Sequence, residues 1–410
     1  MTTPTHTTAL DFADPAIQID PYPHYQRLRD DMPVAWNGRT WLISRYADIT
    51  TLMTDPRMSS ARTEQTFSVL PPDVQAELTP LRTILGSRML LTDPPRHTRL
   101  KNIVAKAFSP RMIEGRRARI EQICQQFLDE VCGRGEMDVM DDFAAKLPGW
   151  AITDVLGVPY LDQPQFTRWA RDQVKIYDRA GLTQDRVGIM RQGQKSMLEM
   201  KAYLDAVIEQ RRVEPKDDLI TELVQAEEDG DRLTHDELFG MCVALLVGGN
   251  NSTAHLIGNA ALTFINQPDA LVQLLADPAL IAAATEEVMR YDSPVQATSR
   301  IAKERMEFKG EVFEAGQGVF MLFGSANRDE RKFANPTTFD MTRKHNPHLS
   351  FAHGAHYCLG VAVARLVSQV GILAMLQRCK NMRLVSDKIE WLPGFAFRGP
   401  NVLPVKFEAS

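Results

Sequence analysis

Apolar residues recur every three to four positions over most of the chain, and this spacing is typical of helices that bury one face. The stretch between about residues 58 and 93 is less periodic, so we expect a long irregular connection there, with one short helix. The predicted helices cover about residues 95–107, 110–132, 186–212, 217–226, 234–264, 278–291 and 359–377.

Short β-type segments lie on either side of the helical region. Asn37-Gly38 separates two short apolar runs and predicts a hairpin with a type I′ turn. The pattern as a whole predicts a mainly α-helical fold with a small β-rich lobe. Its β-rich parts are expected at about residues 33–43, 295–323 and 383–407, and its helical parts at about 95–292 and 359–377.

The longest predicted helix begins near Thr234, where Thr234-x-x-Glu237 matches a capping box, and continues to about Phe264. It is apolar nearly all round, so we expect it to cross the core. Its centre, Gly248 to Thr253, consists of poor helix formers. Two interpretations stay open: a local kink at a close helix contact, or a distortion that faces a ligand.

Composition narrows the functional classes. The 410 residues are 44% hydrophobic and carry a net charge of −5, which favours neither nucleic acid nor an anionic membrane as a partner. No apolar run of about 18 residues and no signal peptide are seen, which predicts a cytoplasmic protein. Length alone favours two or three domains. The five cysteines include no C-x-x-C pair, which argues against a disulfide framework or a zinc finger.

Cys358 is the cysteine that lies outside an apolar helical pattern. It precedes a strong helix and stands between Gly354 and Gly360, so backbone N–H groups and the helix dipole would favour its thiolate. From the residues alone three interpretations remain: a metal ligand, a nucleophile with His353 or His356 as its base, or a buried structural cysteine.

The segment Phe351-x-x-Gly354-x-His356-x-Cys358-x-Gly360 resembles the haem-binding loop of the cytochrome P-450 family at every defining position. The resemblance implies haem b as cofactor, with Cys358 as the thiolate ligand of its iron. It also implies that Phe351 shields the sulfur and that His356 hydrogen-bonds a haem propionate. Gly360 completes the loop.

Other segments extend the resemblance over nearly the whole chain. Glu287-x-x-Arg290 resembles the family's E-x-x-R motif, and Arg343 follows with the spacing of its third member. The resemblance implies that these three residues form a structural ion network behind the haem. An i,i+3 pair of this kind would by itself be an ordinary surface ion pair.

The propionate contacts implied by the resemblance are His97, Lys101 and Arg300. Lys101 departs from the family, which usually has arginine there, and lysine lacks the bidentate fork of a guanidinium. Arg99 lies only two positions from His97, so we expect its side chain to leave on another face of the helix.

The central helix also departs from the family. The expected small residue, glycine, acid and threonine correspond to Gly248, Gly249, Asn251 and Ser252. The resemblance implies that the glycines keep a groove beside bound O₂ and that Ser252 takes part in oxygen binding and proton delivery. Asn251 can hydrogen-bond but cannot relay a proton by titrating.

By the same analogy, the substrate is an apolar small molecule and electrons come from a separate ferredoxin or flavodoxin-type protein. Arg111, Arg116, Arg117 and Arg119 form a basic run that fits either a solvated helix face or a docking surface for such a donor. The predicted pocket residues are Ala244, Val247, Val295, Gln296, Ala297, Phe395 and Phe397.

Because motifs from His97 to Cys358 must meet at one haem, the resemblance revises the domain number to a single domain over residues 1–410, expected to be a monomer. The implied reaction is insertion of one oxygen atom from O₂ into the substrate. Alternatives are a peroxide-driven or non-hydroxylating haem-thiolate oxidase, for example one that couples carbon atoms, and a non-catalytic haem-binding sensor.

Overall fold

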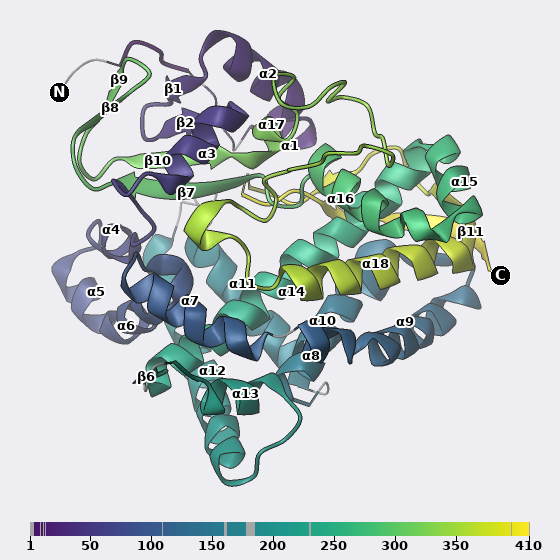
Figure 1. Ribbon diagram of the computed structural model, residues 1–410, viewed down its shortest axis with the longest axis horizontal. Coiled ribbons are helices and arrows are strands. Elements are labelled where there is room, and N and C mark those ends of the chain that lie inside the picture. Colours follow the sequence, from purple (N-terminus) through teal and green to yellow (C-terminus); the bar gives the residue numbers. More distant parts are fainter. Residues whose placement is uncertain are drawn as a thin grey trace.

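The computed structural model describes residues 4–409, except 9, 11, 13, 109, 160–161, 178–184, 229–230 and 395. Figure 1 shows a helical body with a smaller sheet region along one side, and α14 passes through the middle of the helices. The helices of eight or more residues are α2 (Tyr22–Asp31), α3 (Tyr46–Thr54), α6 (Thr79–Ser87), α7 (Arg96–Ala107), α9 (Arg117–Cys132), α10 (Lys146–Leu156), α11 (Gln163–Tyr177), α12 (Arg186–Val213), α14 (His235–Asn266), α15 (Pro268–Ala276), α16 (Ile281–Tyr291) and α18 (Val361–Arg378).

The shorter helical elements connect these. They are α1 (Pro15–Ile19), α4 (Thr63–Phe67), α5 (Pro72–Glu77), η1 (Met89–Leu91), α8 (Pro110–Glu114), η2 (Val139–Ala144), α13 (Leu219–Gln225), η4 (Pro278–Leu280), α17 (Phe323–Ala326) and η5 (Gly354–His356). The prediction of one short helix between residues 58 and 93 was wrong, because α4, α5, α6 and η1 all form there. The predicted helix over 110–132 is divided into α8 and α9 around Gly115 and Arg116.

A five-stranded sheet forms the main part of the β-rich lobe, in the order β1-β2-β10-β7-β3. Its strands are β1 (Val34–Trp36), β2 (Trp41–Ile43), β3 (Met58–Ser59), β7 (Ala297–Ala302) and β10 (Gly318–Leu322). The other strands are β4 (Glu136–Asp138), β5 (Glu227–Glu228), β6 (Asp231–Arg232), β8 (Met306–Phe308), β9 (Glu311–Phe313), β11 (Cys379–Leu384), β12 (Glu390–Trp391), β13 (Pro400–Val402) and β14 (Pro404–Ala409).

The first hairpin forms as predicted, but its turn differs. Val34 pairs with Ile43 and Trp36 with Trp41, and the N–H of Asn37 donates to the carbonyl oxygen of Thr40. Gly38 has a positive φ of 88°, whereas Asn37 is not in the left-handed region. A type I′ turn at Asn37-Gly38 needs positive φ at both residues, so that prediction was wrong.

The central helix α14 begins at the predicted capping box. The Thr234 side chain accepts from the N–H of Glu237, and the Glu237 carboxylate accepts from the N–H of Thr234. The helix continues without a break through Gly248–Thr253, so the predicted kink or distortion is absent from its hydrogen-bonding pattern. Most of its residues are buried, which is expected of a helix that other helices surround.

One of the described helices, α18, is long and apolar enough by composition to span a membrane, with mean hydropathy 1.3 over 18 residues. Its 18 residues include Arg365 and Gln369, so the expectation that the chain has no uninterrupted apolar run of about 18 residues stands. More than half of α18 (56%) is buried inside the protein, and it packs against α9, α14 and α16. A core helix meets the same criterion as a membrane span.

Candidate functional site

The loop before α18 is fixed to the end of α16 by buried hydrogen bonds. The N–H of Leu349 donates to Asn327 Oδ1 (2.7 Å), and Ser350 Oγ donates to the carbonyl oxygen of Met289 (2.7 Å). Gly354 has a φ of +68°, and a Cβ there would approach Thr54 Cγ2 to 3.2 Å. Glycine is needed at that position, because any other residue would be strained by the positive φ and by the contact of its Cβ with Thr54.

Cys358 follows this turn, and its N–H donates to the carbonyl oxygen of Phe351 (2.9 Å). The side chain has accessible surface, yet surrounding protein buries it enough to raise the pKa of the thiol. Its accessible surface therefore borders an interior opening. The N–H of Gly360 and the cations of Lys101 and Arg365 act in the opposite direction, toward thiolate.

The pKa of the thiol bears on the interpretations that the sequence left open. The sequence predicted that the Cys358 thiolate would be favoured, but burial raises the pKa of the thiol instead. A metal ion that binds the sulfur would favour the thiolate again. Among the described residues, neither His353 nor His356 hydrogen-bonds the sulfur, so a nucleophile with a histidine base is not assembled. A metal-ligand role fits best.

Phe351 lies behind the loop with a ring that is 6% exposed. Its ring centroid is 6.3 Å from that of Tyr357, and the Arg365 guanidinium lies 5.1 Å above the ring. Arg365 also donates two hydrogen bonds to the Glu286 carboxylate, at 2.8 and 2.6 Å. Arg365 and Glu286 thus hold Phe351 in place. Sequence reasoning missed both, although Glu286 is adjacent to the predicted Glu287.

Four side chains from distant segments form what we call the cationic cluster: His97 on α7, Arg300 on β7, His356 in η5 and Arg62 before α4. The two histidine rings are 3.9 Å apart between centroids. Burial, together with Arg300, His97, Arg62 and Lys101, lowers the pKa of His356 to about 3. Burial and then Arg62 lower the pKa of Arg300 to about 10.

Among the described residues, no carboxylate forms a hydrogen bond or ion pair with His97 or Arg300, and Asp93 acts on both from farther away. His97 is 1% exposed, and neither of its ring nitrogens has a hydrogen-bond partner. Arg300 is 4% exposed and donates to Thr298 Oγ1 (3.4 Å) and to the Ser299 carbonyl oxygen (2.9 Å). Buried cations and orphaned imidazoles are costly unless an anion binds, and two carboxylates of one ligand meet that need.

Lys101 lies beside His97 and His356 and also contacts the loop around Cys358. Its Nζ donates to the carbonyl oxygens of Ala355 (2.6 Å) and Tyr357 (3.4 Å), so it ties α7 to the loop around Cys358. Arg99 turns away, as expected, and pairs with Glu237 and Asp231. Arg62 was missed, because an arginine in an irregular segment has no distinguishing pattern.

The remaining wall comes from the middle of α14. Ala244, Val247, Gly248, Asn251 and Ser252 are partly or fully exposed, whereas the residues before and after them are largely buried. Spacings of three and four place these five on one face, which we call the open face of α14. A Cβ at Gly248 would meet no atom within 4 Å, and the same holds at Gly360. A Cβ at Gly249 would lie 3.5 Å from Ile152 Cδ1 on α10.

Ser252 and its neighbours differ in direction. Ser252 Oγ donates to the carbonyl oxygen of Gly248 (2.9 Å) and is on the open face. Thr253 is 3% exposed, and Asn250 is 6% exposed with an unpartnered Oδ1, so both point into the protein. The sequence could not show which of the two adjacent hydroxyls, Ser252 or Thr253, and which of the two adjacent amides, Asn250 or Asn251, is on the open face. The helix places Ser252 and Asn251 there.

Glu287, Arg290 and Arg343 form what we call the ion network. The Glu287 carboxylate accepts from Arg290 at 2.7 and 2.8 Å, and from Arg343 Nε at 3.2 Å. It also accepts from Asn346 Nδ2 (3.0 Å) and the N–H of Asp340 (2.9 Å). Glu287 and Arg290 are fully buried. Every charge in the network is partnered.

Comparison with known proteins identifies this arrangement. A family model for cytochrome P-450 matches residues 272–388. Cytochrome P-450 107B1 of Saccharopolyspora erythraea is 39% identical over 404 residues, which span 96% of each chain. The cytochrome P-450 monooxygenase PikC of Streptomyces venezuelae is 36% identical over 95% of this chain and 91% of its own.

The solved structure of P450BioI, in complex with acyl carrier protein ligated to hexadec-9Z-enoic acid, has a TM-score of 0.87 and 34% identity, covering 96% of this chain and 100% of that one. The chain belongs to the cytochrome P-450 family. It has the P-450 fold, binds haem b and is a haem-thiolate monooxygenase of the bacterial type, which uses a small-molecule substrate and redox partners.

The residues around the opening fit haem b. The Cys358 sulfur is of the type that ligates P-450 iron, the cationic cluster suits two propionates, and Gly248 and Gly360 leave open space beside them. Thus the predicted haem residues of this P-450 are brought together, and Lys101, whose charge acts on both histidines, also donates to the loop.

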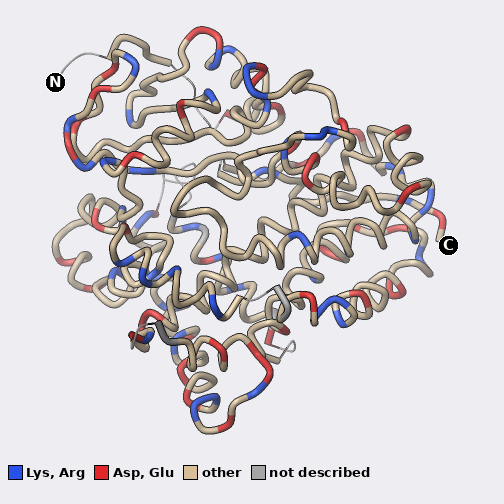
Figure 2. Tube along the Cα trace, viewed as in Figure 1, with Lys and Arg blue, Asp and Glu red and all other residues tan. Residues whose placement is uncertain are grey.

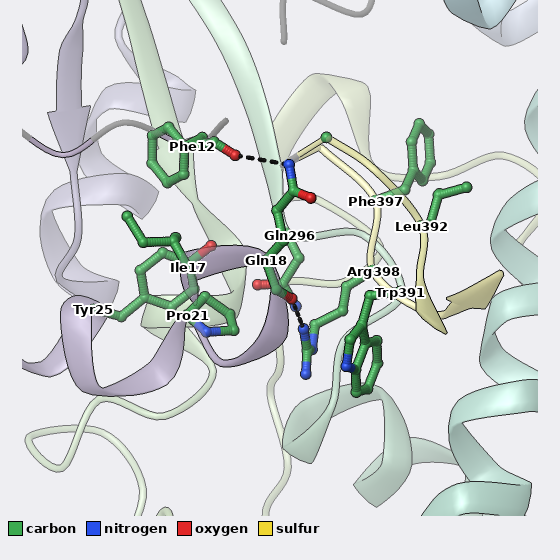
Figure 3. Close-up of a pocket in the computed structure, with 11 residues that line it drawn as sticks. Phe12, Ile17, Gln18, Pro21, Tyr25, Gln296, Trp391, Leu392, Phe397 and Arg398 are labelled. Atoms are coloured by element: carbon green, nitrogen blue, oxygen red, sulfur yellow. Dashed lines mark hydrogen bonds between the residues drawn. The ribbon is translucent and has the colours of Figure 1, made fainter. Parts of the chain in front are cut away.

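The predicted pocket residues of the P-450 are not all brought together. Gln296 and Phe397 line a small pocket between α1 and the C-terminal segment, drawn in Figure 3, to which α14 contributes no residue. Gln296 is 2% exposed and donates to the Ser293 carbonyl oxygen at 2.8 Å. The prediction that Gln296 and Phe397 line one pocket with Ala244 and Val247 therefore finds no support in this geometry.

Three further pocket predictions have different outcomes. Ala297 is 7% exposed and packs in a core cluster with residues of α1, α2 and β10, whereas Val295 is partly buried and pairs with Phe397 through an isolated bridge. Phe395 lies outside the described residues.

The basic run is largely neutralised by acids. Arg117 pairs with Glu114, while Arg116 and Arg119 both approach Asp154, at 3.7 and 2.8 Å. Figure 2 shows both basic and acidic residues along α9, with Arg117 and Arg119 at its start and Glu121, Asp129 and Glu130 after them. The side chain of Arg111 is outside the described residues. The described arginines of this run therefore offer little net positive charge to an electron donor.

Proposed function

We propose that this P-450 inserts one atom of O₂ into an apolar small molecule and receives electrons from a separate ferredoxin or flavodoxin-type protein. The observation that carries the proposal is the open face of α14, where apolar Ala244 and Val247 are next to Ser252 and Asn251. Haem b supplies oxygen activation when bound. The similarity to P450BioI, whose solved complex contains a hexadecenoyl chain, supports an apolar substrate.

In this proposal each side chain has a defined task. Cys358 ligates the iron, and the cationic cluster orients the propionates. Ala244 and Val247 exclude water from the substrate and contact its apolar surface. Ser252 Oγ holds a proton that it can pass on, after releasing its hydrogen bond to the Gly248 carbonyl oxygen. Asn251 orients water by hydrogen bonding, because its amide does not titrate.

We further propose a single domain over residues 1–410 that acts as a cytoplasmic monomer. Two alternatives use the same site: peroxide-driven or non-hydroxylating oxidation, favoured by the amide at Asn251, and haem-based sensing without turnover. To separate the peroxide-driven oxidase from the monooxygenase, product yield is measured once with a ferredoxin, its reductase and NADH, and once with hydrogen peroxide alone. A compound that shifts the Soret band and yields an ¹⁸O-labelled product from ¹⁸O₂ excludes the sensor.

The hydroxyl assignment is tested by a matched pair of variants. Ser252→Ala should lower product formed per NADH by roughly ten-fold and release the balance as hydrogen peroxide, because proton delivery fails. Thr253→Val, one residue away on the buried side, should leave this ratio near the parent value. Equal effects of the two variants would remove Ser252 from the proposal.

Asn251 provides a second test. Asn251→Asp supplies a titratable group on the open face, so product per NADH should rise above the parent value. Asn251→Gln keeps an amide and serves as the control. If coupling is already tight in the parent and unchanged in Asn251→Asp, water-mediated proton delivery through Asn251 is wrong.

A further inference from the structure

Two of the cysteines that the haem site does not use lie side by side. Cys132 is the last residue of α9, and Cys379 is the first residue of β11, directly after α18. Cys132 acts on the Cys379 thiol as a close neighbour, the side chain of Arg378, the residue before Cys379, reaches the Cys132 sulfur at 3.6 Å, and neither cysteine is in a disulfide. They are 247 residues apart in the chain (379 − 132), and they are brought together by the packing of α9 against α18 and by the pairing of β4 and β11 with β14.

The surroundings of the two sulfurs differ. Cys379 is 2% exposed, and burial together with the neighbouring Cys132 raises the pKa of its thiol to about 12. Cys132 is partly exposed, and Arg378 Nη2 lies 3.6 Å from its sulfur. Arg378 is held there by hydrogen bonds to Asp129 (2.8 Å) and Gln125 (2.8 Å). A fixed cation beside an accessible sulfur is the setting in which cysteines react with oxidants.

We propose that Cys132 and Cys379 form a peroxide-sensitive site that converts from two thiols to one disulfide. The oxidant is hydrogen peroxide, which a monooxygenase releases when reduced O₂ leaves without oxidising the substrate. The Cys132 thiolate attacks one peroxide oxygen, the O–O bond breaks, and sulfenic acid and hydroxide form. The Cys379 thiol then attacks this sulfur, the S–O bond breaks, and the second water leaves.

The step balances as two thiols and one hydrogen peroxide giving one disulfide and two waters, with two electrons passing from sulfur to oxygen. Cys132 is attacked first, because it is accessible and near the guanidinium, and buried Cys379 resolves it. The disulfide connects the end of α9 to the end of α18. It is at the far end of the helix that follows Cys358, so it stabilises the fold without contacting the iron site.

The experiment uses the haem-loaded full chain, fully reduced and then freed of reductant. It is treated with a few equivalents of hydrogen peroxide, blocked with N-ethylmaleimide under denaturing conditions and digested without reduction for mass spectrometry. We expect a Cys132–Cys379 linked peptide and the loss of two maleimide-reactive thiols. The unfolding midpoint of the oxidised protein should rise by about 3 °C, because the cross-link closes a long loop.

Three variants make the result decisive. In Cys379→Ser, Cys132 should remain as sulfenic acid that dimedone traps, and in Cys132→Ser no cross-link or rise in midpoint should occur. Cys124→Ser is the matched control on the same helix and should still form the cross-link. The proposal would be overturned if, in the parent, Cys132 were oxidised while Cys379 still reacted with maleimide. A disulfide between other cysteines would also overturn it.

Discussion

Two buried charged regions on either side of the opening are built in opposite ways. In the ion network, Glu287 accepts hydrogen bonds from Arg290, Arg343, Asn346 and the backbone, so the charges balance inside the protein. In the cationic cluster, the His97 nitrogens have no partners, and Arg300 forms no ion pair with a carboxylate among the described residues, because Asp93 acts on it only from farther away.

This difference distinguishes scaffold from binding site. A network whose charges are satisfied gains nothing from a ligand and loses much when one member is removed. In the cationic cluster the buried Arg300 guanidinium and the partly buried Arg62 repel each other, the low pKa of His356 keeps its ring neutral, and a bound anion would pair with these groups. The two regions should therefore respond in opposite directions to the loss of one arginine.

The largest effect is expected from Arg290→Ala. It leaves the buried Glu287 carboxylate without its main partner and should lower the free energy of unfolding by about 3–5 kcal/mol, with or without haem. Urea unfolding of both forms measures this. Arg117→Ala removes an exposed pair on α9 and should cost less than about 1 kcal/mol. Similar losses in the two variants would contradict the comparison.

Arg300→Gln changes the cationic cluster, and we expect it to affect haem binding more than the stability of the haem-free protein. Removing one buried cation relieves repulsion, so the haem-free protein should be no less stable than the parent in urea. Haem affinity should fall by roughly ten-fold or more, because a charge-assisted hydrogen bond contributes about 1.5–3 kcal/mol. Faster haem transfer to apomyoglobin measures the loss. A haem-free protein destabilised as much as Arg290→Ala would refute an anion-binding role.

A smaller effect should appear at Glu286, between the two regions. Burial opposes ionisation, yet hydrogen bonds from His348 and Arg365 hold the pKa of this carboxyl at about 2. Because the folded pKa is below the ordinary value of about 4.5, the ionised group stabilises the fold above about pH 4.5. That contribution, about 1–2 kcal/mol after allowing for partial exposure, is lost as the pH falls toward 2.

The variant Glu286→Gln makes this testable. It should lose the same 1–2 kcal/mol at neutral pH, and its unfolding free energy should fall less steeply than the parent's between about pH 4.5 and 2. Unfolding in urea across this range gives both profiles. Identical slopes in parent and variant would show that the hydrogen bonds of Glu286 do not favour its ionised form.

The sequence predicted the helical body because periodicity over long segments reflects burial of one face. It missed α4 and α5, since helices this short depend on contacts with distant segments. Motif spacing identified Cys358, His97 and the ion network, but it could not determine side-chain directions. Gln296 turns toward α1, and Lys101 reaches loop carbonyls, because of neighbours remote in sequence.

The partners of Glu287 also constrain how this chain can evolve. Replacing Glu287 or Arg290 alone leaves an unpaired buried charge, so these two positions can change only together, whereas replacing Arg343 leaves their pair intact. Ala244 and Val247, which border open space, can each change alone at little cost to the fold. New substrate preferences are therefore reachable by single mutations on α14, while the support behind the haem stays fixed.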